Sequence, residues 1–226
     1  MLSICQGFAD SCFSHPGSVL WPLPDRSLRT GRPKVPAMPL QEKAHLMTES
    51  EINRTLVHLA HEIVDKTEDL PALAFVGIHR RGIPLAERLA LKIREISSIE
   101  VPIATLDIQS YRDDFSPVSS RPVVHPNQIS ISITGKDVIL VDDVLYTGRS
   151  TRAALDALFD HGRPRRVRLC VLIDRGHREL PIEASFVGKK VVTAYSEEIE
   201  VKLRETDGVE KVLLLDRDGS TPAQVS

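Results

Sequence analysis

Two adjacent carboxylates, Asp142 and Asp143, end an apolar run and precede a loop of hydroxyl residues and one glycine. The loop, residues 147–151, reads Thr-Gly-Arg-Ser-Thr, and its hydroxyl and backbone N–H groups could surround a phosphate at the start of a helix. Gly148 would let the backbone approach this anion closely. Ionised carboxylates only accept hydrogen bonds, so the two aspartates suit sugar hydroxyls. Together the pair and the loop predict a site for a ribose 5-phosphate.

A simpler explanation accounts for only part of this pattern. An aspartate that ends a strand often caps the helix that follows, because its carboxylate accepts hydrogen bonds from the helix N-terminus. Capping explains one carboxylate, but not two adjacent ones followed by a turn of hydroxyls and glycine. We therefore prefer the ribose phosphate interpretation.

Composition places the chain among ordinary globular proteins. It has 226 residues, of which 42% are hydrophobic and 27% charged, and a net charge of −2. That balance argues against wholesale coating of nucleic acid, although a local basic face is allowed. No apolar run approaches the ~20 residues that span a bilayer. The three cysteines, Cys5, Cys12 and Cys170, have no metal-ligand spacing and are odd in number. We expect a cytoplasmic protein with no membrane partner and with Cys170 as a buried thiol.

The first 46 residues differ from the rest. They hold six prolines and show no sustained helical or strand period. We interpret residues 1–46 as an N-terminal extension, either disordered or an over-extended start, and residues 47–226 as one domain. Thr48 and Glu51 have the spacing of a capping box, which predicts a helix over about 49–66.

Strand and helix patterns alternate along the domain. Apolar residues at helical spacing predict further helices over 84–96 and 150–162. Apolar runs predict strands at 72–78, 101–108, 129–133, 137–143 and 166–174, and shorter ones around 186–193, 198–203 and 211–215. Such alternation predicts an α/β fold, with a largely parallel sheet and helices on both faces. The carboxyl ends of these strands bring the loop after Ile78, the two aspartates and the turn after Ile173 to one rim, where ligands bind.

The stretch VILVDDVLYTGRST resembles the phosphoribosyl pyrophosphate (PRPP) signature of type I phosphoribosyltransferases. The stretches VGIHRRG, SYRDD and DRGHRELPI extend this resemblance, over about residues 48–216, to the bifunctional pyrimidine-operon attenuators that are also uracil phosphoribosyltransferases. The resemblance implies the type I phosphoribosyltransferase fold, a mainly parallel sheet flanked by helices with a small hood.

The resemblance also implies a reaction, in which uracil and PRPP give UMP and pyrophosphate with Mg²⁺. Asp142 and Asp143 would hold the ribose hydroxyls, directly or through the waters of the metal, and no direct protein ligand of the metal is certain. The loop HRRG would offer Arg80 and Arg81 to the pyrophosphate. Arg112, in SYRDD, would lie on a loop that closes over the reaction and, like the other two arginines, would stabilise the leaving group. The rest of the implied PRPP site is Val144, Leu145, Tyr146, Thr147, Gly148, Arg149, Ser150 and Thr151.

Base recognition and regulation are implied by resemblance alone. Arg175 matches a position beside the base, and Ile199 would present backbone groups to uracil. Regulators of this family are dimers that bind a stem-loop of pyrimidine-operon mRNA when UMP or UTP is bound; tetramers are also possible. The positions near the RNA-binding face are occupied by His61, His177, Arg178 and Lys189.

Two departures and one basic run bear on the RNA. Val57 and Glu183 stand where family regulators often carry a polar and a basic residue, and an acid is unfavourable against RNA phosphate. The arginines between 163 and 168 add local positive charge, or simply form a solvated connection between helix and strand.

Three functions therefore remain open from the sequence. The first is an active uracil phosphoribosyltransferase, with or without regulation of pyrimidine genes. The second is an RNA-binding attenuator whose nucleotide pocket is only a sensor with little catalysis. The third is a phosphoribosyltransferase for another base, such as a purine. The loop GxxxxGK[ST] of nucleotide triphosphatases is absent from the sequence, which excludes a P-loop ATPase.

Overall fold

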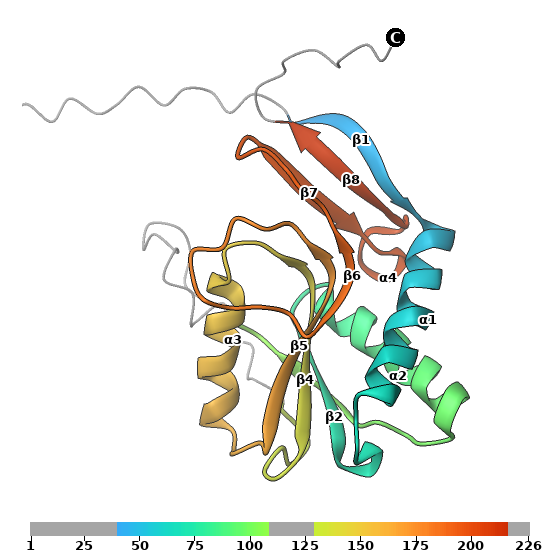
Figure 1. The fold of residues 1–226 in the computed structure, drawn as a ribbon, viewed down its shortest axis with the longest axis vertical. Helices are drawn as coiled ribbons and strands as arrows, with labels where there is room; N and C mark the ends of the chain where they lie inside the picture. Colours follow the sequence, from blue (N-terminus) through green and yellow to red (C-terminus); the bar gives the residue numbers. More distant parts are fainter. Residues whose placement is uncertain (1–39, 109–128, 217–226) are drawn as a thin grey trace, which may run out of the picture. The chain divides into compact units, whose positions relative to one another are not determined.

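A parallel sheet of five strands forms the centre of the fold (Figure 1). The computed structural model describes residues 40–108 and 129–216, which belong to one compact unit, Met38–Ser226. The strand order is β3-β2-β4-β5-β6, and every neighbouring pair is parallel. The strands are β2 (Leu73–Ile78), β3 (Ile103–Leu106), β4 (Asp137–Leu145), β5 (Arg166–Asp174) and β6 (Phe186–Lys190).

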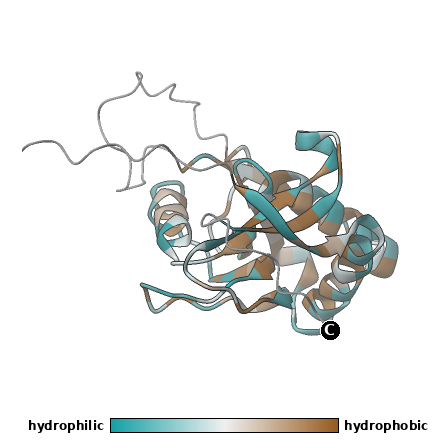
Figure 2. Ribbon diagram, turned by 90° about the horizontal axis from the view of Figure 1, so that it is seen from above, coloured by the Kyte–Doolittle hydropathy of each residue, from teal (hydrophilic) through white to brown (hydrophobic). Residues whose placement is uncertain are grey.

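Helices cover both faces of this sheet. Helices α1 (Glu49–Asp65) and α2 (Gly82–Ser97) lie on one face, and α3 (Arg149–Asp160) lies on the other (Figure 1). Alternate residues of each strand serve the two faces: Phe75 and Ile139 pack in the core with α1 and α2, whereas Val76 and Val138 pack with α3. In Figure 2 the apolar ribbon accordingly gathers inside the fold, and hydrophilic ribbon marks outer helix faces and loops.

A second, antiparallel sheet forms a small hood, which we define as strands β1, β7 and β8 with helix α4. Its strand order is β1-β8-β7. The strands are β1 (Gln41–Thr48), β7 (Glu197–Lys202) and β8 (Lys211–Asp216); α4 (Arg204–Asp207) joins the last two, and a 3-10 turn, η2 (Leu70–Ala72), precedes β2. The hood shares the core on the α1 side, where Ile199 and Val212 are buried.

The α/β prediction is confirmed, including the parallel sheet with helices on both faces. The predicted capping box is present, because Thr48 Oγ1 accepts from the Glu51 N–H and Glu51 Oε2 accepts from the Thr48 N–H. Cys170 is a buried free thiol as expected, and burial raises its pKa to about 12. Within residues 40–108 and 129–216, we find no helix with the length and apolarity that a membrane crossing requires.

Two predictions are wrong. Residues 41–46, assigned to a disordered extension or an over-extended start, form most of strand β1. Every side chain from Gln41 to His45 is exposed, so the strand is stabilised by its pairing with β8 and carries little apolar pattern. Residues 129–133 form no strand, and Ile133 is buried in an irregular segment instead. The predicted loop 109–128 lies outside the described residues, as do residues 1–39.

Candidate active site

A cleft opens where three adjacent strands, β2, β3 and β4, reach their carboxyl ends. Its volume is about 300 Å³. The residues that line it are Ile78, His79, Arg80, Arg81, Asp107, Ile108, Asp142, Asp143, Val144 and Ser150. The structure thus brings together the two aspartates, the two arginines of HRRG and one hydroxyl of the 147–151 loop. Asp107 was not predicted; its only sequence signal is its place after a strand.

The two aspartates are held by the backbone at the end of β4. Asp142 Oδ1 accepts a hydrogen bond of 2.9 Å from the Asp143 N–H, and Asp143 Oδ1 accepts one of 2.9 Å from the Val144 N–H. Burial raises the pKa of Asp143, and the positive charge of Arg81, whose Nη1 lies 4.0 Å from Asp143 Oδ2, opposes that rise. A cation or a set of hydroxyl donors beside this pair would therefore be stabilised.

The arginine loop lies directly against β4. A Cβ atom on Gly82 would come within 2.2 Å of the Val141 carbonyl oxygen, so only glycine permits this approach. The peptide bond between His79 and Arg80 is cis. Arg80 is exposed, whereas Arg81 is partly buried and donates from Nε and Nη2 to both carboxylate oxygens of Asp207 in the hood.

The loop after β4 leads into helix α3 as its sequence predicts. Gly148 adopts a φ of +92°, in the left-handed region that favours glycine, and the helix begins at Arg149. Its N-terminus therefore meets the cleft through Ser150, and Thr151 is buried behind it. The side chain of Arg149 instead forms an ion pair of 2.6 Å with Glu179.

The comparisons with known proteins agree with this geometry. Residues 48–206 match the family model described as the phosphoribosyl transferase domain. The chain belongs to the phosphoribosyltransferase family. It is 55% identical over 178 residues to the bifunctional protein PyrR of Thermus thermophilus, covering 79% of this chain and 98% of that protein. It is 53% identical over 174 residues to the bifunctional protein PyrR of Deinococcus deserti, covering 77% and 95%.

A solved structure supports the fold. The hypoxanthine phosphoribosyltransferase of Staphylococcus aureus superposes with a TM-score of 0.60 at 22% identity, covering 80% of this chain and 95% of that one. The predicted type I phosphoribosyltransferase fold is therefore confirmed, with the parallel sheet carrying the cleft and the antiparallel sheet forming the hood.

Beside the cleft, this phosphoribosyltransferase has a second pocket of about 300 Å³, after β5. It is lined by Asp174, Arg175, Gly176, His177, Lys190, Val191 and Val192. The Arg175 guanidinium is buried, lies 3.8 Å from the centre of the Tyr146 ring and donates to Thr193 Oγ1 at 3.0 Å. It also donates to the Glu197 carbonyl oxygen. Arg175 thus packs against the Tyr146 ring and joins the end of β5 to the hood.

The other residue predicted beside the base, Ile199, lies in β7. Its side chain is buried in the core, and its backbone is paired with Leu214 of β8. Thr193, which holds Arg175, was missed by sequence reasoning, because a lone threonine in a loop carries no pattern.

The residues predicted to bind RNA have unequal surroundings. His61 is exposed on α1, and the exposed Lys189 donates from Nζ to the Leu46 carbonyl oxygen at 2.9 Å. His177 Nε2 lies 2.7 Å from the Thr193 carbonyl oxygen, and its ring centre lies 4.3 Å from that of Tyr195. These contacts place His177 beside the second pocket.

Arg178 joins several segments of the chain through hydrogen bonds. It donates from Nη2 to Asp174 Oδ1 at 2.6 Å, from Nε to the Ile182 carbonyl oxygen and from Nη1 to the carbonyl oxygens of Leu145, Tyr146 and Gly176. These bonds join the turn after β5 to the end of β4, next to the 147–151 loop.

Three arginines of the run between residues 163 and 168, which leads into β5, are also engaged internally. Arg165 makes a bidentate pair with the buried Asp137, and Arg168 donates to Thr67 Oγ1 at 2.8 Å. Arg163 donates to the Phe159 carbonyl oxygen at the end of α3. These three contacts favour the interpretation of the run as a structural connection between helix and strand.

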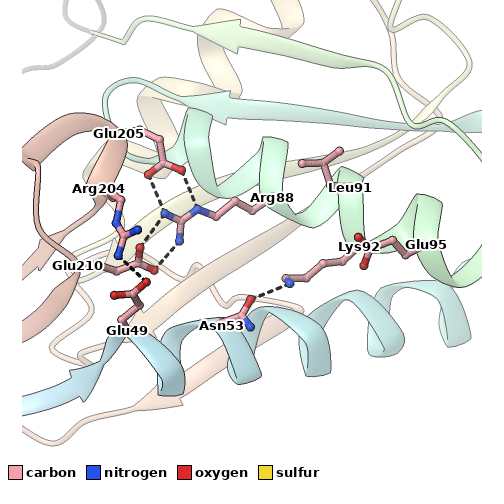
Figure 3. Close-up of a pocket in the computed structure, with 9 residues that line it drawn as sticks. All are labelled: Glu49, Asn53, Arg88, Leu91, Lys92, Glu95, Arg204, Glu205 and Glu210. Carbon is pink, nitrogen blue, oxygen red and sulfur yellow. Dashed lines mark hydrogen bonds and ion pairs between the residues drawn. The ribbon is translucent and has the colours of Figure 1, made fainter.

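A third pocket, of about 470 Å³, lies away from the strand ends, along α1 and α2 (Figure 3). It is lined by Glu49, Asn53, Arg88, Leu91, Lys92, Glu95, Arg204, Glu205 and Glu210. Its charges meet each other across the groove: Arg88 contacts Glu205 and Glu210, and Arg204 contacts Glu49. Such mutual pairing indicates a structural joint between the hood and the helices.

Proposed function

We propose that this phosphoribosyltransferase transfers the phosphoribosyl group of PRPP to uracil, giving UMP and pyrophosphate. The observation that carries the proposal is the meeting of Asp142 and Asp143 with the arginine loop and the start of α3 in one cleft. The relatives named bifunctional protein PyrR favour a second, regulatory role. We assign both roles to this chain, acting in the cytoplasm.

In the reaction, the bond between C1 of the ribose and the pyrophosphate oxygen breaks, and a bond from C1 to N1 of uracil forms as N1 loses its proton. Positive charge develops on the ribose while the pyrophosphate leaves. Asp142 and Asp143 hold the ribose hydroxyls and stabilise that positive charge, and Arg80 and Arg81 stabilise the leaving group. Arg112 lies outside the described residues, and its part in stabilising the leaving group stays a prediction from the resemblance.

The 5-phosphate binds at the start of α3, which reaches the cleft through Ser150. The first N–H groups of a helix have no partner within the helix, and the helix dipole favours a negative charge there. Ser150 and Thr147 add hydroxyl groups, and Gly148 supplies the left-handed backbone conformation that leads into the helix. Val144, Leu145, Tyr146, Arg149 and Thr151 shape the loop around them.

The chemistry of the donors fits Mg²⁺ carried in with PRPP. Magnesium is usually held in proteins by one or two carboxylates together with substrate phosphates. Within residues 40–108 and 129–216, no group of three or more His, Cys, Asp or Glu side chains could hold a metal by itself. Asp142 and Asp143 would hold the ion jointly with the substrate, and the ion would neutralise charge on the pyrophosphate.

The base binds in the pocket after β5, beside Arg175 and the backbone near Ile199. Tyr146 connects the two sites along the chain: it follows β4, which carries the aspartates, and its ring centre lies 3.8 Å from the Arg175 guanidinium. This arrangement favours a base held next to C1 of the ribose.

The regulatory role is binding of pyrimidine-operon mRNA by a homodimer or homotetramer when UMP or UTP fills the site. His61 and Lys189 provide exposed basic groups for the RNA. Because Arg178 and His177 are held by internal contacts, we assign them an indirect part, in which they shape the surface between base pocket and RNA. The hydrophobic Val57 and the acidic Glu183 are both exposed and weaken this face.

The proposed enzyme is tested by UMP formation from uracil and PRPP with Mg²⁺, using the full chain. We expect turnover with uracil and none with hypoxanthine or guanine. Turnover with a purine but not with uracil would show that the substrate is another base. UMP binding without any turnover would make the pocket a sensor, as in the second function left open by the sequence.

RNA binding is tested by filter binding of a pyrimidine-operon stem-loop at several salt concentrations. We expect UMP to tighten binding and Lys189→Ala to reduce the salt slope by about 1, because one phosphate contact is lost. Arg94→Ala removes an exposed cation of α2 and serves as the control. Equal binding by both variants and no response to UMP would contradict the regulatory role.

A further inference from the structure

Two arginines of the α2 region face the hood segment 204–210. Arg81 precedes the first residue of α2, and Arg88 lies seven positions later, about two helical turns along the same face. Arg88 donates to Glu205 at 2.8 and 2.7 Å and to Glu210 at 2.6 and 2.9 Å (Figure 3). Arg81 donates to Asp207 at 3.1 and 2.9 Å. The hood segment therefore contacts the α2 region at both positions through paired, charge-assisted hydrogen bonds. We call these contacts the Arg81 grip and the Arg88 grip.

The two grips lie in different surroundings. The Arg88 grip belongs to the charged groove along α1 and α2, which contains none of the cleft residues. Arg81 lines the cleft, and its Nη1 is 4.0 Å from Asp143 Oδ2. Asp207 thus connects the hood directly to a cation of the cleft.

Asp207 holds the guanidinium in one orientation. Its carboxylate takes Nε and Nη2, so that Nη1 is the part of the group nearest the aspartate pair. The carboxylate is itself held, because Asp207 Oδ2 accepts from the Leu203 N–H at 2.9 Å. The hydrogen bonds from Arg81 lower the pKa of Asp207 to about 2, so the carboxylate is charged at neutral pH. A cation fixed in this way loses little further freedom when it binds an anion.

We propose that Asp207 is a positioning residue of the hood, which orients Arg81 toward the pyrophosphate group of PRPP. The inference rests on the proposed function, because it takes the cleft to be the PRPP site. It deepens that function by making the hood a working part of the pyrophosphate site. The negative charge of Asp207 also repels a bound anion. Neutralising it would therefore tighten pyrophosphate binding if repulsion were its main effect, and weaken binding if its main effect is to position Arg81.

The test compares Asp207→Asn with Glu205→Gln. Each variant removes one hood carboxylate that contacts an α2 arginine, but Arg88 keeps Glu210 when Glu205 is neutralised. Calorimetry of pyrophosphate with Mg²⁺ measures binding without turnover. We expect Asp207→Asn to weaken pyrophosphate binding and raise KM for PRPP, each by about tenfold, with KM for uracil unchanged. Glu205→Gln leaves all three values at those of the wild type, and melting curves of both variants establish that they are folded.

A double-mutant cycle separates positioning from a general structural role. In an Arg81→Ala background, Asp207→Asn is expected to have no further effect on pyrophosphate binding. An undiminished effect in that background, or pyrophosphate binding by Asp207→Asn that is unchanged or tighter, overturns the inference. Failure of the wild-type chain to bind pyrophosphate or PRPP would overturn the proposed function first, before any variant is compared.

Discussion

Replacing Asp142 and Asp143 together by asparagine is expected to lower kcat/KM for phosphoribosyl transfer by about 1,000-fold or more. In the proposed reaction, the two carboxylates provide the negative charge beside the ribose as positive charge develops there. An amide has the same shape but carries no charge, so ribose binding loses less than transition-state stabilisation. The measurement is steady-state UMP formation from uracil and PRPP.

The same variant is expected to remain folded. Each aspartate accepts a backbone N–H through Oδ1, and an asparagine Oδ1 accepts the same bond. Burial raises the pKa of Asp143, so its ionisation costs stability above that raised pKa and the cost disappears as pH falls. Thermal unfolding at neutral pH is therefore expected near or above the wild-type midpoint, since asparagine removes that cost.

The matched control changes the same charge elsewhere. Asp156→Asn with Asp160→Asn neutralises two exposed carboxylates of α3, outside the cleft. This control is expected to keep wild-type activity. Near-normal activity in the Asp142 and Asp143 variant would refute the assigned ribose site.

Removing residues 1–46 is expected to lower the midpoint of thermal unfolding by about 5 °C or more and to promote association of the chains. The shortened chain loses most of β1, so β8 becomes an open strand edge from Asp216 to Leu213, while Met47 keeps its pairing with Val212. It also loses Lys43, whose Nζ lies 2.6 Å from the buried carboxylate of Glu197. Melting curves and light scattering measure both effects.

The pH dependence of this loss has a definite sign. The Lys43 hydrogen bond lowers the pKa of Glu197 in the folded chain. The stability gained from this ion pair is therefore present above the unfolded pKa of glutamate, about 4.3, and is lost as the pH falls below that value. The difference in stability between the two chains is therefore expected to narrow in acid.

A chain starting at Leu40 provides the control, because it keeps β1 and every contact described for it. It is expected to have the same midpoint of thermal unfolding as the full chain. Equal stability of the chains starting at Leu40 and at Met47 would contradict a role for β1. Activity should accordingly be measured on chains that retain this strand.

Local patterns were sufficient to predict the main sheet and the centre of the site. The strands β2, β4 and β5 are continuous apolar runs because both of their faces are buried, and that signal is strong in the sequence. The carboxylate pair and the hydroxyl loop are consecutive in the chain, so their spacing predicts their chemistry directly. The capping box of Thr48 is equally local, since its partners are three residues apart.

Other features depend on contacts between distant segments. The side chains of β1 are exposed from Gln41 to His45, so this part of the strand forms because β8 offers it backbone partners, and no period within residues 41–46 reveals this. The strand predicted at 129–133 fails for the opposite reason. Its alternating pattern is that of a strand, and Ile133 is buried in the core with Ile129 and Ile131 partly buried against it, but the backbone there forms no ladder.

The sequence alone was enough to predict the type of fold and a cleft at the carboxyl ends of the strands, because both follow from periodicity and from adjacent residues. The contacts of the arginines depend on the tertiary structure. Arg165, Arg168 and Arg178 satisfy internal acceptors, and Arg81 is held by Asp207, 126 positions away. The local sequence around an arginine does not show which acceptor it will contact. That acceptor depends on the packing of segments that are distant in the chain.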